Sequence, residues 1–584
     1  MKESFRTLRP YVARYKARFA LGMGSLILKD VTAAMLPLII RQAVDALNTG
    51  SRPSLVLRYA GLLVGVSLLK GFFQYWMRYI LIGISRDVEY DYRNDLFAHL
   101  TTLAPDFYGR HRTGDIMARA TNDLNAVRMM LGPGVMYWTE TSLTFALAIS
   151  IMGWIDWRLM LLAILPAPLV SFAVVYFGRR IHTRFEAIQS MFSDISSRVQ
   201  ENLSAVRMIR AFVQEDAEIR RFAALNREYI AQNLRLVRVQ GLFEPLLEAL
   251  IGLTFLIVLW AGGVQVAGGR ITLGSFVMFN TYMGMLVWPM IALGWVVNLM
   301  QRGTASLSRL NQILYEKPGI AAPPEPVRKA EWRGEIDFED VRVSYAAGDA
   351  LAGVSLRIPA GRTVAIVGHT GSGKTTLANL IPRLMDPASG VVRIDGVDAR
   401  QLDPAELRRQ IGLVPQETFL FSASLAENIA FGVESATREE IQRAAELAGL
   451  ATDIAAFPLG LDTPVGERGI TLSGGQKQRT AIARAVLRQP RILILDDALA
   501  SVDTITEERI LNGLANVMRG RTVVLISHRV STVRGADEIV VLKHGRIQER
   551  GTHDALFAAG GLYAELAQKQ MLEEELEAIT TIQN

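Results

Sequence analysis

Long apolar stretches dominate residues 1–310, whereas short apolar runs broken by glycine, proline and charged residues fill residues 335–570. A helix needs about 20 mostly apolar residues to cross a bilayer, at ~1.5 Å per residue. Six segments of the first part have this character: 19–40, 57–82, 135–155, 159–178, 250–267 and 271–301. Charged residues interrupt chiefly the first two of them. The pattern predicts a polytopic α-helical membrane domain with six transmembrane helices, followed by a water-soluble domain.

The loops between these segments differ in length, and their charge sets the expected orientation. Those after the second and fourth segments are long, at about 83–134 and 179–244, and are rich in arginine. Residues 1–18 carry six basic side chains against one acid, Glu3. Basic residues that flank a span favour the cytoplasm. We expect both termini and both long loops on the cytoplasmic side, and no cleaved signal peptide, because the first apolar stretch is too long and no A-x-A-like site follows it.

Composition narrows the class of protein. Of 584 residues, 50% are hydrophobic, and the mean hydropathy of +0.22 exceeds that of ordinary soluble enzymes. The chain has no cysteine, which excludes disulfides, thiolate zinc sites and cysteine nucleophiles. A net charge of +6 is too small to indicate a nucleic-acid partner. A proline-rich connector gives the predicted division of the chain: membrane domain 1–315, linker 316–334, soluble domain 335–572 and tail 573–584.

Charged side chains inside the predicted spans need an explanation, because an unpaired charge is costly in lipid. Two interpretations stay open: they line a water-filled pathway, or they pair across the helix bundle or lie near the interface. The same choice, cavity or packing, applies to polar and aromatic residues of the last segment. The charged residues are Lys29, Asp30, Lys70, Glu140 and Glu248, and the others are Asn280, Tyr282, Trp288 and Asn298.

A phosphate-binding motif opens the soluble domain. A β-branched run at 363–367 predicts a buried strand, and a G-x-x-x-x-G-K-T sequence follows it directly. Glycines allow backbone N–H groups to face phosphate oxygens at the start of the next helix, the lysine adds a positive charge, and the hydroxyl of Thr375 suits Mg²⁺. The predicted nucleotide contacts are Gly368, His369, Thr370, Gly371, Ser372, Gly373, Lys374, Thr375 and Thr376.

A second buried strand, 492–496, ends in Asp496, about 120 residues after the P-loop lysine. A carboxylate in this position is the expected acid on the Mg²⁺ side of a P-loop nucleotide site. Two elements that are distant in sequence and converge on one phosphate site are far more specific than either alone. The soluble domain is therefore predicted to be an α/β P-loop nucleotide-binding domain that takes ATP and Mg²⁺.

Between these strands lies Leu-Ser-Gly-Gly-Gln at 472–476, followed by a basic helix. This sequence resembles the signature of ATP-binding-cassette proteins. The resemblance covers the whole chain, because six spans with two long inner loops and then one cassette is the layout of bacterial ABC exporter half-transporters. It implies a fold of the ABC exporter type.

The resemblance implies roles for further residues, position by position. Tyr345 is similar to the aromatic residue that stacks on adenine, Gln416 to the glutamine near Mg²⁺, and His528 to the switch histidine at the γ-phosphate. The signature residues and the D-loop aspartate are expected to contact ATP or the partner cassette: Ser473, Gly474, Gly475, Gln476 and Asp503. Thr375, Gln416 and Asp496 are the implied Mg²⁺ ligands, and Gln416, Asp497 and His528 the implied catalytic residues.

One position departs from the family pattern. Active cassettes carry glutamate after the second-strand aspartate, as general base for the attacking water, and this chain has Asp497. Aspartate is one methylene shorter, which withdraws its carboxylate by ~1.5 Å, and a base must come within ~2.6–3.2 Å of its proton. Misplacement of this order costs ~10²-fold in rate. We expect ATP to bind well and to hydrolyse slowly at this chain's own site.

An intact signature beside a weakened base favours a heterodimer. In this family two cassettes close head to tail, and each ATP lies between one P-loop and the other chain's signature. This chain's signature would then serve a competent site on a second half-transporter. A homodimer that hydrolyses slowly stays open.

The resemblance implies ATP-driven export of a hydrophobic or amphipathic small molecule, of multidrug type, in the bacterial cytoplasmic (inner) membrane, with the ATP-binding domain in the cytoplasm. Membrane lipid and a hydrophobic substrate are the expected partners besides the second half-transporter. A lipid or lipid-precursor flippase of the same architecture is the alternative.

Overall fold

The computed structural model describes residues 2–49, 53–345, 348–469, 471–500 and 504–583. The chain divides into two compact units, each described here by itself. The first comprises Met1–Thr101 and His111–Glu316, and the second comprises Thr102–Arg110 and Lys317–Asn584. The second unit thus includes a nine-residue segment from the first long inner loop, with the short helix α4 (Pro105–Arg110) and its buried Phe107.

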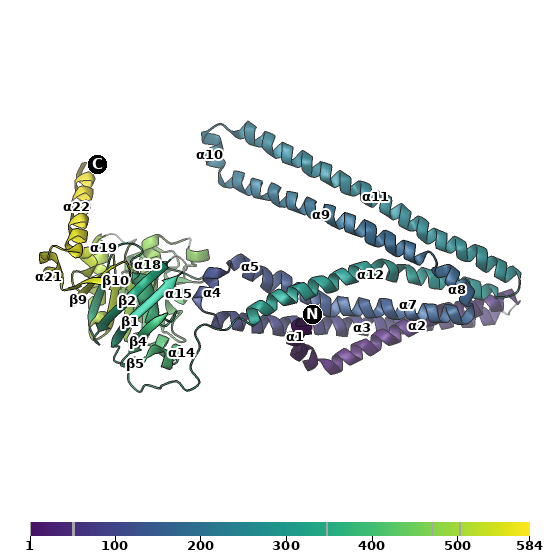
Figure 1. Ribbon diagram of the computed structural model, residues 1–584, viewed down its shortest axis with the longest axis horizontal. Helices are drawn as coiled ribbons and strands as arrows, with labels where there is room; N and C mark the ends of the chain where they lie inside the picture. The colour runs from purple at the N-terminus through teal and green to yellow at the C-terminus, as the bar shows by residue number, and fades with distance from the viewer. Residues whose placement is uncertain (1, 50–52, 346–347, 470, 501–503, 584) are drawn as a thin grey trace. The chain divides into compact units, whose positions relative to one another are not determined.

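The first unit is built from helices, several of them very long (Figure 1). In chain order they are α1 (Lys2–Arg14), α2 (Lys16–Asn48), α3 (Pro53–Thr102), α5 (Thr113–Ala118), α6 (Leu124–Met129), α7 (Val135–Ile155), α8 (Trp157–Ile164), α9 (Ala167–Ser204), α10 (Val206–Ala211), α11 (Glu215–Ala267) and α12 (Leu273–Leu314). Two π-helical segments, η1 (Arg119–Asp123) and η2 (Met130–Gly134), join α5, α6 and α7.

Six helical runs among the described residues are long and apolar enough to span a membrane, as predicted: Lys16–Asn48, Ser54–Thr102, Thr113–Ile155, Trp157–Ser204, Glu215–Ala267 and Leu273–Leu314. The longest has 53 residues, which corresponds to ~80 Å of helix, against a ~30 Å hydrocarbon core. The predicted long loops are therefore mostly helical continuations of the spans. Figure 1 shows α9 and α11 running side by side, joined through α10.

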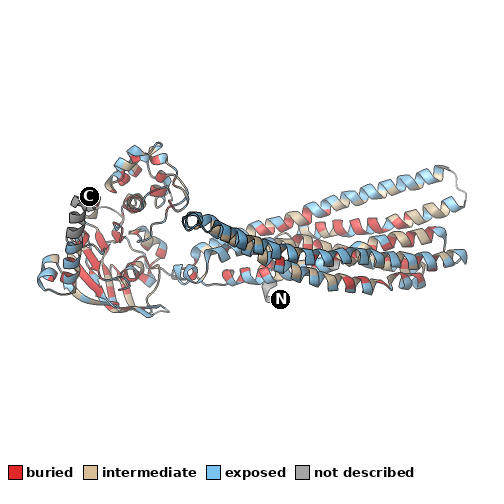
Figure 2. Cartoon of the chain, turned by 90° about the horizontal axis from the view of Figure 1, so that it is seen from above, coloured by how far each residue is buried: buried red, intermediate tan, exposed pale blue. Residues whose placement is uncertain are grey.

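Buried contacts hold α12 against α2 and α7. Tyr282 of α12 is fully buried and donates a hydrogen bond of 2.5 Å to the carbonyl oxygen of Ala34 on α2. Of the two interpretations offered for Tyr282, packing is therefore the one observed. Outward positions of the long helices are exposed (Figure 2), and many are large and apolar, such as Leu57 at 74% and Phe172 at 68% exposed. An apolar outer surface of this extent suits contact with lipid.

The second unit contains two sheets, visible as the arrows in Figure 1. A four-stranded antiparallel sheet has the order β2-β1-β4-β5 and a six-stranded sheet the order β10-β9-β3-β8-β7-β6. The strands are β1 (Ile336–Tyr345), β2 (Gly348–Ile358), β3 (Thr363–Val367), β4 (Ser389–Ile394), β5 (Val397–Asp398), β6 (Ile411–Val414), β7 (Ile492–Asp496), β8 (Thr522–Ile526), β9 (Glu538–Lys543) and β10 (Arg546–Gly551).

Helices cover these sheets and bury two apolar cores. The helices of this unit besides α4 are α13 (Lys374–Leu380), α14 (Pro404–Arg409), α15 (Leu425–Ala430), α16 (Arg438–Leu447), α17 (Ala451–Ala456), α18 (Gly474–Leu487), α19 (Thr504–Met518), α20 (Val530–Val533), α21 (His553–Ala558) and α22 (Leu562–Gln583). Three short 3₁₀ turns complete the unit: η3 (Ala399–Gln401), η4 (Gly460–Asp462) and η5 (Glu467–Gly469).

The register of the parallel strands decides where the chemistry lies. Strands β3, β8 and β7 are neighbours, with Ile366 opposite Ile526 and Ile526 opposite Asp496. The carboxyl ends of all three strands therefore meet at one edge of the sheet. This edge carries the P-loop after β3, the two aspartates at the end of β7 and His528 shortly after β8, as the α/β arrangement requires of a ligand site.

The proline-rich connector is fixed along the cassette. The carboxylate of Asp395, in the turn between β4 and β5, accepts hydrogen bonds from the backbone N–H groups of Arg333, Gly334 and Glu335 at 3.0, 2.8 and 2.7 Å. Lys329 adds an ion pair of 3.2 Å to the same carboxylate. A segment predicted as a linker is thus ordered by side-chain contacts.

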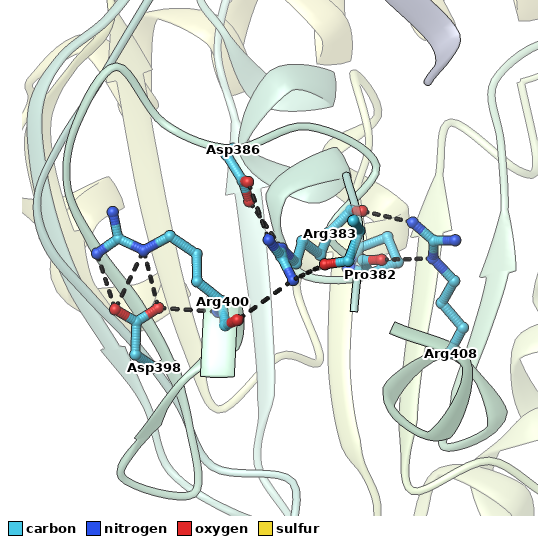
Figure 3. Close-up of polar contacts among 7 residues, drawn as sticks. Pro382, Arg383, Asp386, Asp398, Arg400 and Arg408 are labelled. Atoms are coloured by element: carbon cyan, nitrogen blue, oxygen red, sulfur yellow. Dashed lines mark hydrogen bonds and ion pairs between the residues drawn. The ribbon is translucent and has the colours of Figure 1, made fainter. Parts of the chain in front are cut away.

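An arginine network lies beside this connector (Figure 3). Arg383, buried at positive φ, pairs with Asp386 and donates to the carbonyl oxygens of Ala321 and Arg400. Arg408 donates to the carbonyls of Pro382 and Arg383 at 3.0 and 2.6 Å. The network ties the end of the P-loop helix to the connector and to α14.

Candidate ATP-binding site

Glycines in the loop between β3 and α13 allow its tight path. Gly373 precedes α13 at φ +103°, and a Cβ atom there would collide with the carbonyl oxygen of Ala350. A Cβ at Gly368 would likewise collide with the carbonyl of Leu542 on the neighbouring strand. These two positions demand glycine, and they leave the backbone N–H groups of the loop and of the helix start for an anion.

Lys374 is held inside this loop. Its Nζ donates to the carbonyl oxygens of Gly368 and His369 at 2.9 and 3.0 Å, and only 6% of the residue is exposed. Burial lowers the pKa of Lys374, and the nearby carboxylates of Asp497 and Asp496 oppose this shift. The arrangement positions one ammonium group where the phosphates of a nucleotide would lie.

Asp496 ends β7 in a buried position beside Thr375. Its Oδ1 is buried without a hydrogen-bond partner among the described residues. Burial raises the pKa of Asp496, a contact with the Thr375 hydroxyl lowers it, and the charge of Asp497 raises it further. A carboxylate oxygen with unused acceptor capacity, beside a hydroxyl, fits a hard divalent cation such as Mg²⁺.

Asp497 is directed toward His528. The Oδ2 atom of Asp497 lies 3.1 Å from His528 Nε2 and 3.5 Å from Gln416 Nε2, and its Oδ1 accepts the backbone N–H of His528 at 3.3 Å. Its backbone has φ +48°, and its carbonyl accepts a 3.3 Å bond from Gln478. The carboxylate of Asp497 is thus 6% exposed and lies within 3.5 Å of three nitrogen atoms.

A cavity of about 280 Å³ brings most of the predicted residues together. It is lined by Tyr345, Ala350, Thr370, Gly371, Ser372, Gly373, Lys374, Thr375, Thr376, Gln416, Asp497 and His528. Gly368 and His369 line an adjoining cavity with His528, and Asp496 is buried behind Thr375. Tyr345 is 51% exposed, which leaves its ring accessible for stacking.

The signature lies at the start of α18, away from the lining of this cavity. Ser473 caps the helix: its hydroxyl accepts the N–H of Gln476 at 3.3 Å, and Gln476 Oε1 accepts the N–H of Ser473 at 2.9 Å. Ser473 and Gly474 are exposed, while Gly475 and Gln476 are half-buried. Asp503 lies outside the described residues.

Two residues of the site were missed by sequence reasoning. Ala350 lines the cavity from β2, and no sequence signal marks it. Gln478 bonds to the carbonyl of Asp497 across the fold, and its only sequence signal is its place two residues after the signature. Both act through the tertiary arrangement of elements that are far apart in the chain.

Two family models match the chain: "ABC transporter transmembrane region" over residues 19–290 and "ABC transporter" over residues 351–500. The chain belongs to the ABC transporter family. Curated relatives cover nearly all of this ABC transporter. The probable multidrug resistance ABC transporter ATP-binding/permease protein YheI of Bacillus subtilis is 38% identical over 96% of each chain. The multidrug resistance-like ATP-binding protein MdlA of Escherichia coli is 38% identical over 98% of each chain.

Other relatives carry a different name. An ATP-dependent lipid A-core flippase of Syntrophus aciditrophicus is 34% identical over 98% of this chain and 95% of its own. Among solved structures, a bacterial Atm1-family ABC exporter with ATP bound matches with a TM-score of 0.78 and 30% identity, over 96% of this chain and 99% of that one. This ABC transporter is therefore an ATP-hydrolysing exporter of the membrane, in a family that functions as dimers.

Proposed function

We propose that this ABC transporter exports a hydrophobic or amphipathic small molecule across the bacterial cytoplasmic membrane, as one half of a dimer driven by ATP. The observation that carries the proposal is the union of a P-loop cavity and six apolar spanning helices in one chain. The names of YheI and MdlA support a substrate of the multidrug type. ATP binding would favour the state in which the cassettes are closed, and hydrolysis would return the transporter to the open state.

The residues of the cavity suit distinct roles toward ATP. Tyr345 would stack on the adenine, the P-loop backbone and Lys374 would hold the phosphates, and His528 would contact the γ-phosphate. Thr375, Asp496 and Gln416 would hold Mg²⁺, which neutralises phosphate charge when bound. The described residues contain no group of three or more His, Cys, Asp or Glu side chains fit for a metal ion, so ATP oxygens would complete its coordination.

Asp497 supports slow hydrolysis at this chain's own site. Its carboxylate is short and is turned toward His528 and Gln416, and both contacts compete with a bond to an attacking water. We propose that the working transporter is a heterodimer, in which this chain's signature completes a faster site on the partner. Ser473, Gly474, Gly475, Gln476 and Asp503 would act across that interface.

A flippase for lipid or lipid precursors is the second candidate, because two relatives are named ATP-dependent lipid A-core flippase. The two candidates differ in what stimulates the ATPase. Purified transporter in detergent should respond to micromolar amphipathic drugs under the export proposal. A response to lipid A precursors alone would favour the flippase.

The P-loop assignment is tested by Lys374→Ala in the full-length transporter. Loss of the buried ammonium should reduce photolabelling by an azido-ATP analogue at least tenfold at a fixed low concentration. Lys317→Ala, at an exposed lysine of the connector, serves as the matched control and should label normally. Equal labelling of both variants would overturn the assignment.

A further inference from the structure

Three charged side chains meet inside the helical bundle of the first unit. Lys29 and Asp30 lie on α2 and Glu140 lies on α7. Lys29 Nζ is 2.6 Å from Asp30 Oδ1 and 2.5 Å from Glu140 Oε1. Lys29 and Asp30 are 4% and 2% exposed. This is the pairing across the bundle that the sequence left open, and we call these residues the ionic triad.

The ionic triad lies far from both ends of its helix. Lys29 is 13 residues after Lys16 and 19 before Asn48, the ends of α2, which corresponds to ~20 and ~28 Å along the axis. It lies in sequence between Leu26, in one apolar cluster, and Leu38, which packs on another. The triad therefore lies in the middle part of a helix that is long enough to span the membrane.

The charges of the ionic triad do not balance. Two carboxylates share one ammonium group, so the triad carries a net charge of −1 when both acids are ionised. Asp30 is buried, is ion-paired with Lys29, and lies beside the hydroxyl of Thr144 on α7. An uncompensated charge at this depth is costly, and residues that keep it are ordinarily functional. A second cation would satisfy the site.

Glu140 is the accessible member. Its side chain is 25% exposed, and its Oε1 is the oxygen that contacts Lys29. One helical turn earlier, Tyr137 packs against Trp295 of α12 with ring centroids 5.3 Å apart. Residues three apart share a helix face. An accessible carboxylate beside aromatic rings is the combination that recognises an organic cation.

We propose that Glu140, held by Lys29 and backed by Asp30, binds the positively charged group of a cationic amphipathic substrate, with the Tyr137–Trp295 pair against its apolar part. The inference rests on the proposed export function and deepens it by naming the charge of the cargo. An organic cation brings the missing positive charge and loses less hydration on entry than a small inorganic ion. Anionic amphiphiles of the same shape are rejected by the net negative charge.

Two probes of nearly identical shape and opposite charge, tetraphenylphosphonium and tetraphenylborate, test this selectivity. The assembled transporter is reconstituted in liposomes with ionophores that abolish the membrane potential, and stimulated ATPase is measured against probe concentration. The unmutated transporter should respond to the cation at concentrations at least tenfold lower than to the anion. Glu140→Gln should raise the half-stimulating concentration of the cation about tenfold, which corresponds to ~1.4 kcal/mol.

Control variants separate charge from structure. Glu140→Asp retains the charge and should keep most of the preference for the cation. Glu248→Gln removes an exposed acid of α11 in another spanning helix and should leave the preference unchanged. If Glu140→Gln does not assemble, the comparison of the two probes on the unmutated transporter still decides whether the transporter prefers the cation to the anion.

The outcomes distinguish this inference from the function beneath it. Equal responses to both probes, or a cation preference that survives Glu140→Gln, overturn the inference while export stands. Absence of any ATPase response to either probe and to neutral amphiphiles, with lipid precursors active, overturns the export proposal itself.

Discussion

Asp496 lies at the end of β7 with 3% of its surface exposed, and its Oδ1 has no hydrogen-bond partner in the described part of the chain. Burial raises the pKa of Asp496 above 3.8, so the folded state binds more protons than the unfolded chain just above that pH. Folding stability from this group therefore falls as the pH rises through that window, and at neutral pH its charge is a penalty. Nucleotide binding needs the charge that folding disfavours.

Asp496→Asn should accordingly raise the unfolding free energy of the nucleotide-free cassette by about 1 kcal/mol at pH 7.5, while ATPase activity falls at least a hundredfold. Thermal unfolding of the full-length transporter without nucleotide measures the first effect. The gain should shrink as the pH is lowered, because the raised pKa of Asp496 lets the folded state take up a proton before the unfolded chain does. A lower melting temperature than that of the unmutated protein at pH 7.5 would contradict the argument.

The residues of the P-loop could be predicted from the sequence, whereas the side-chain contacts around the P-loop could not. The positions of Gly373 and Lys374 are encoded locally, because the loop geometry requires glycine and the motif fixes the spacing. The contacts of Asp497 with His528 and Gln416 are different, since three elements of the sheet bring them together. The same limit applies to Lys29 and Glu140, which are 111 residues apart and whose pairing no local pattern encodes.

At the scale of elements, the connector shows how a few side chains order an irregular segment. Asp395 is in a left-handed conformation at φ +51°, its side chain is 6% exposed, and it accepts three backbone N–H groups. The proline content predicted a boundary, and the reason for its order lies in a turn 60 residues away. Long-range capping of this kind leaves no periodic signal in the sequence.

Asp395→Ala should lower the unfolding free energy of the cassette by about 2–3 kcal/mol, because three donors lose a charged acceptor. Asp340→Ala is the matched control: Asp340 also has positive φ, at +44°, but its side chain is 70% exposed. Strain from alanine at positive φ is common to both variants, so the difference in denaturant midpoint isolates the hydrogen bonds. Equal midpoints would show that Asp395 does not fix the connector.

The length of the helices is a second feature of the elements that the sequence pattern does not predict. Hydropathy located the apolar centre of each span, whereas it gave no length for polar helical continuations such as the arginine-rich parts of α9 and α11. The hydrophobic pattern fades there because the helices leave lipid, and their helicity rests on pairing with each other. Six spans were predictable, and their extents were not.

At the scale of the whole molecule, the predicted orientation places Thr113 and Asp156 on opposite sides of the membrane. Thr113 begins a helical run of 43 residues, which is ~64 Å long, and Asp156 directly follows it. The chain has no native cysteine, so Thr113→Cys and Asp156→Cys provide unique labels. In intact cells a membrane-impermeant maleimide should label position 156 and spare position 113, and inverted vesicles should give the reverse. Labelling of both from one side would overturn the orientation inferred from the basic flanks.

The asymmetry of the two ATP sites is tested on the assembled transporter with its natural partner. If Asp497 is a weak base at a site that mainly retains ATP, Asp497→Asn should keep most of the steady-state ATPase. Ser473→Ala should reduce it about 10²–10³-fold, because the serine would hydrogen-bond developing charge at the partner's site.

Ser473 also caps α18, so Thr437→Ala, which breaks the same kind of capping box on α16, controls for lost helix stability. That control should cost about 1 kcal/mol in stability and leave turnover unchanged. In a homodimer Asp497 would be the base at both sites, and near-complete loss in Asp497→Asn would refute the heterodimer.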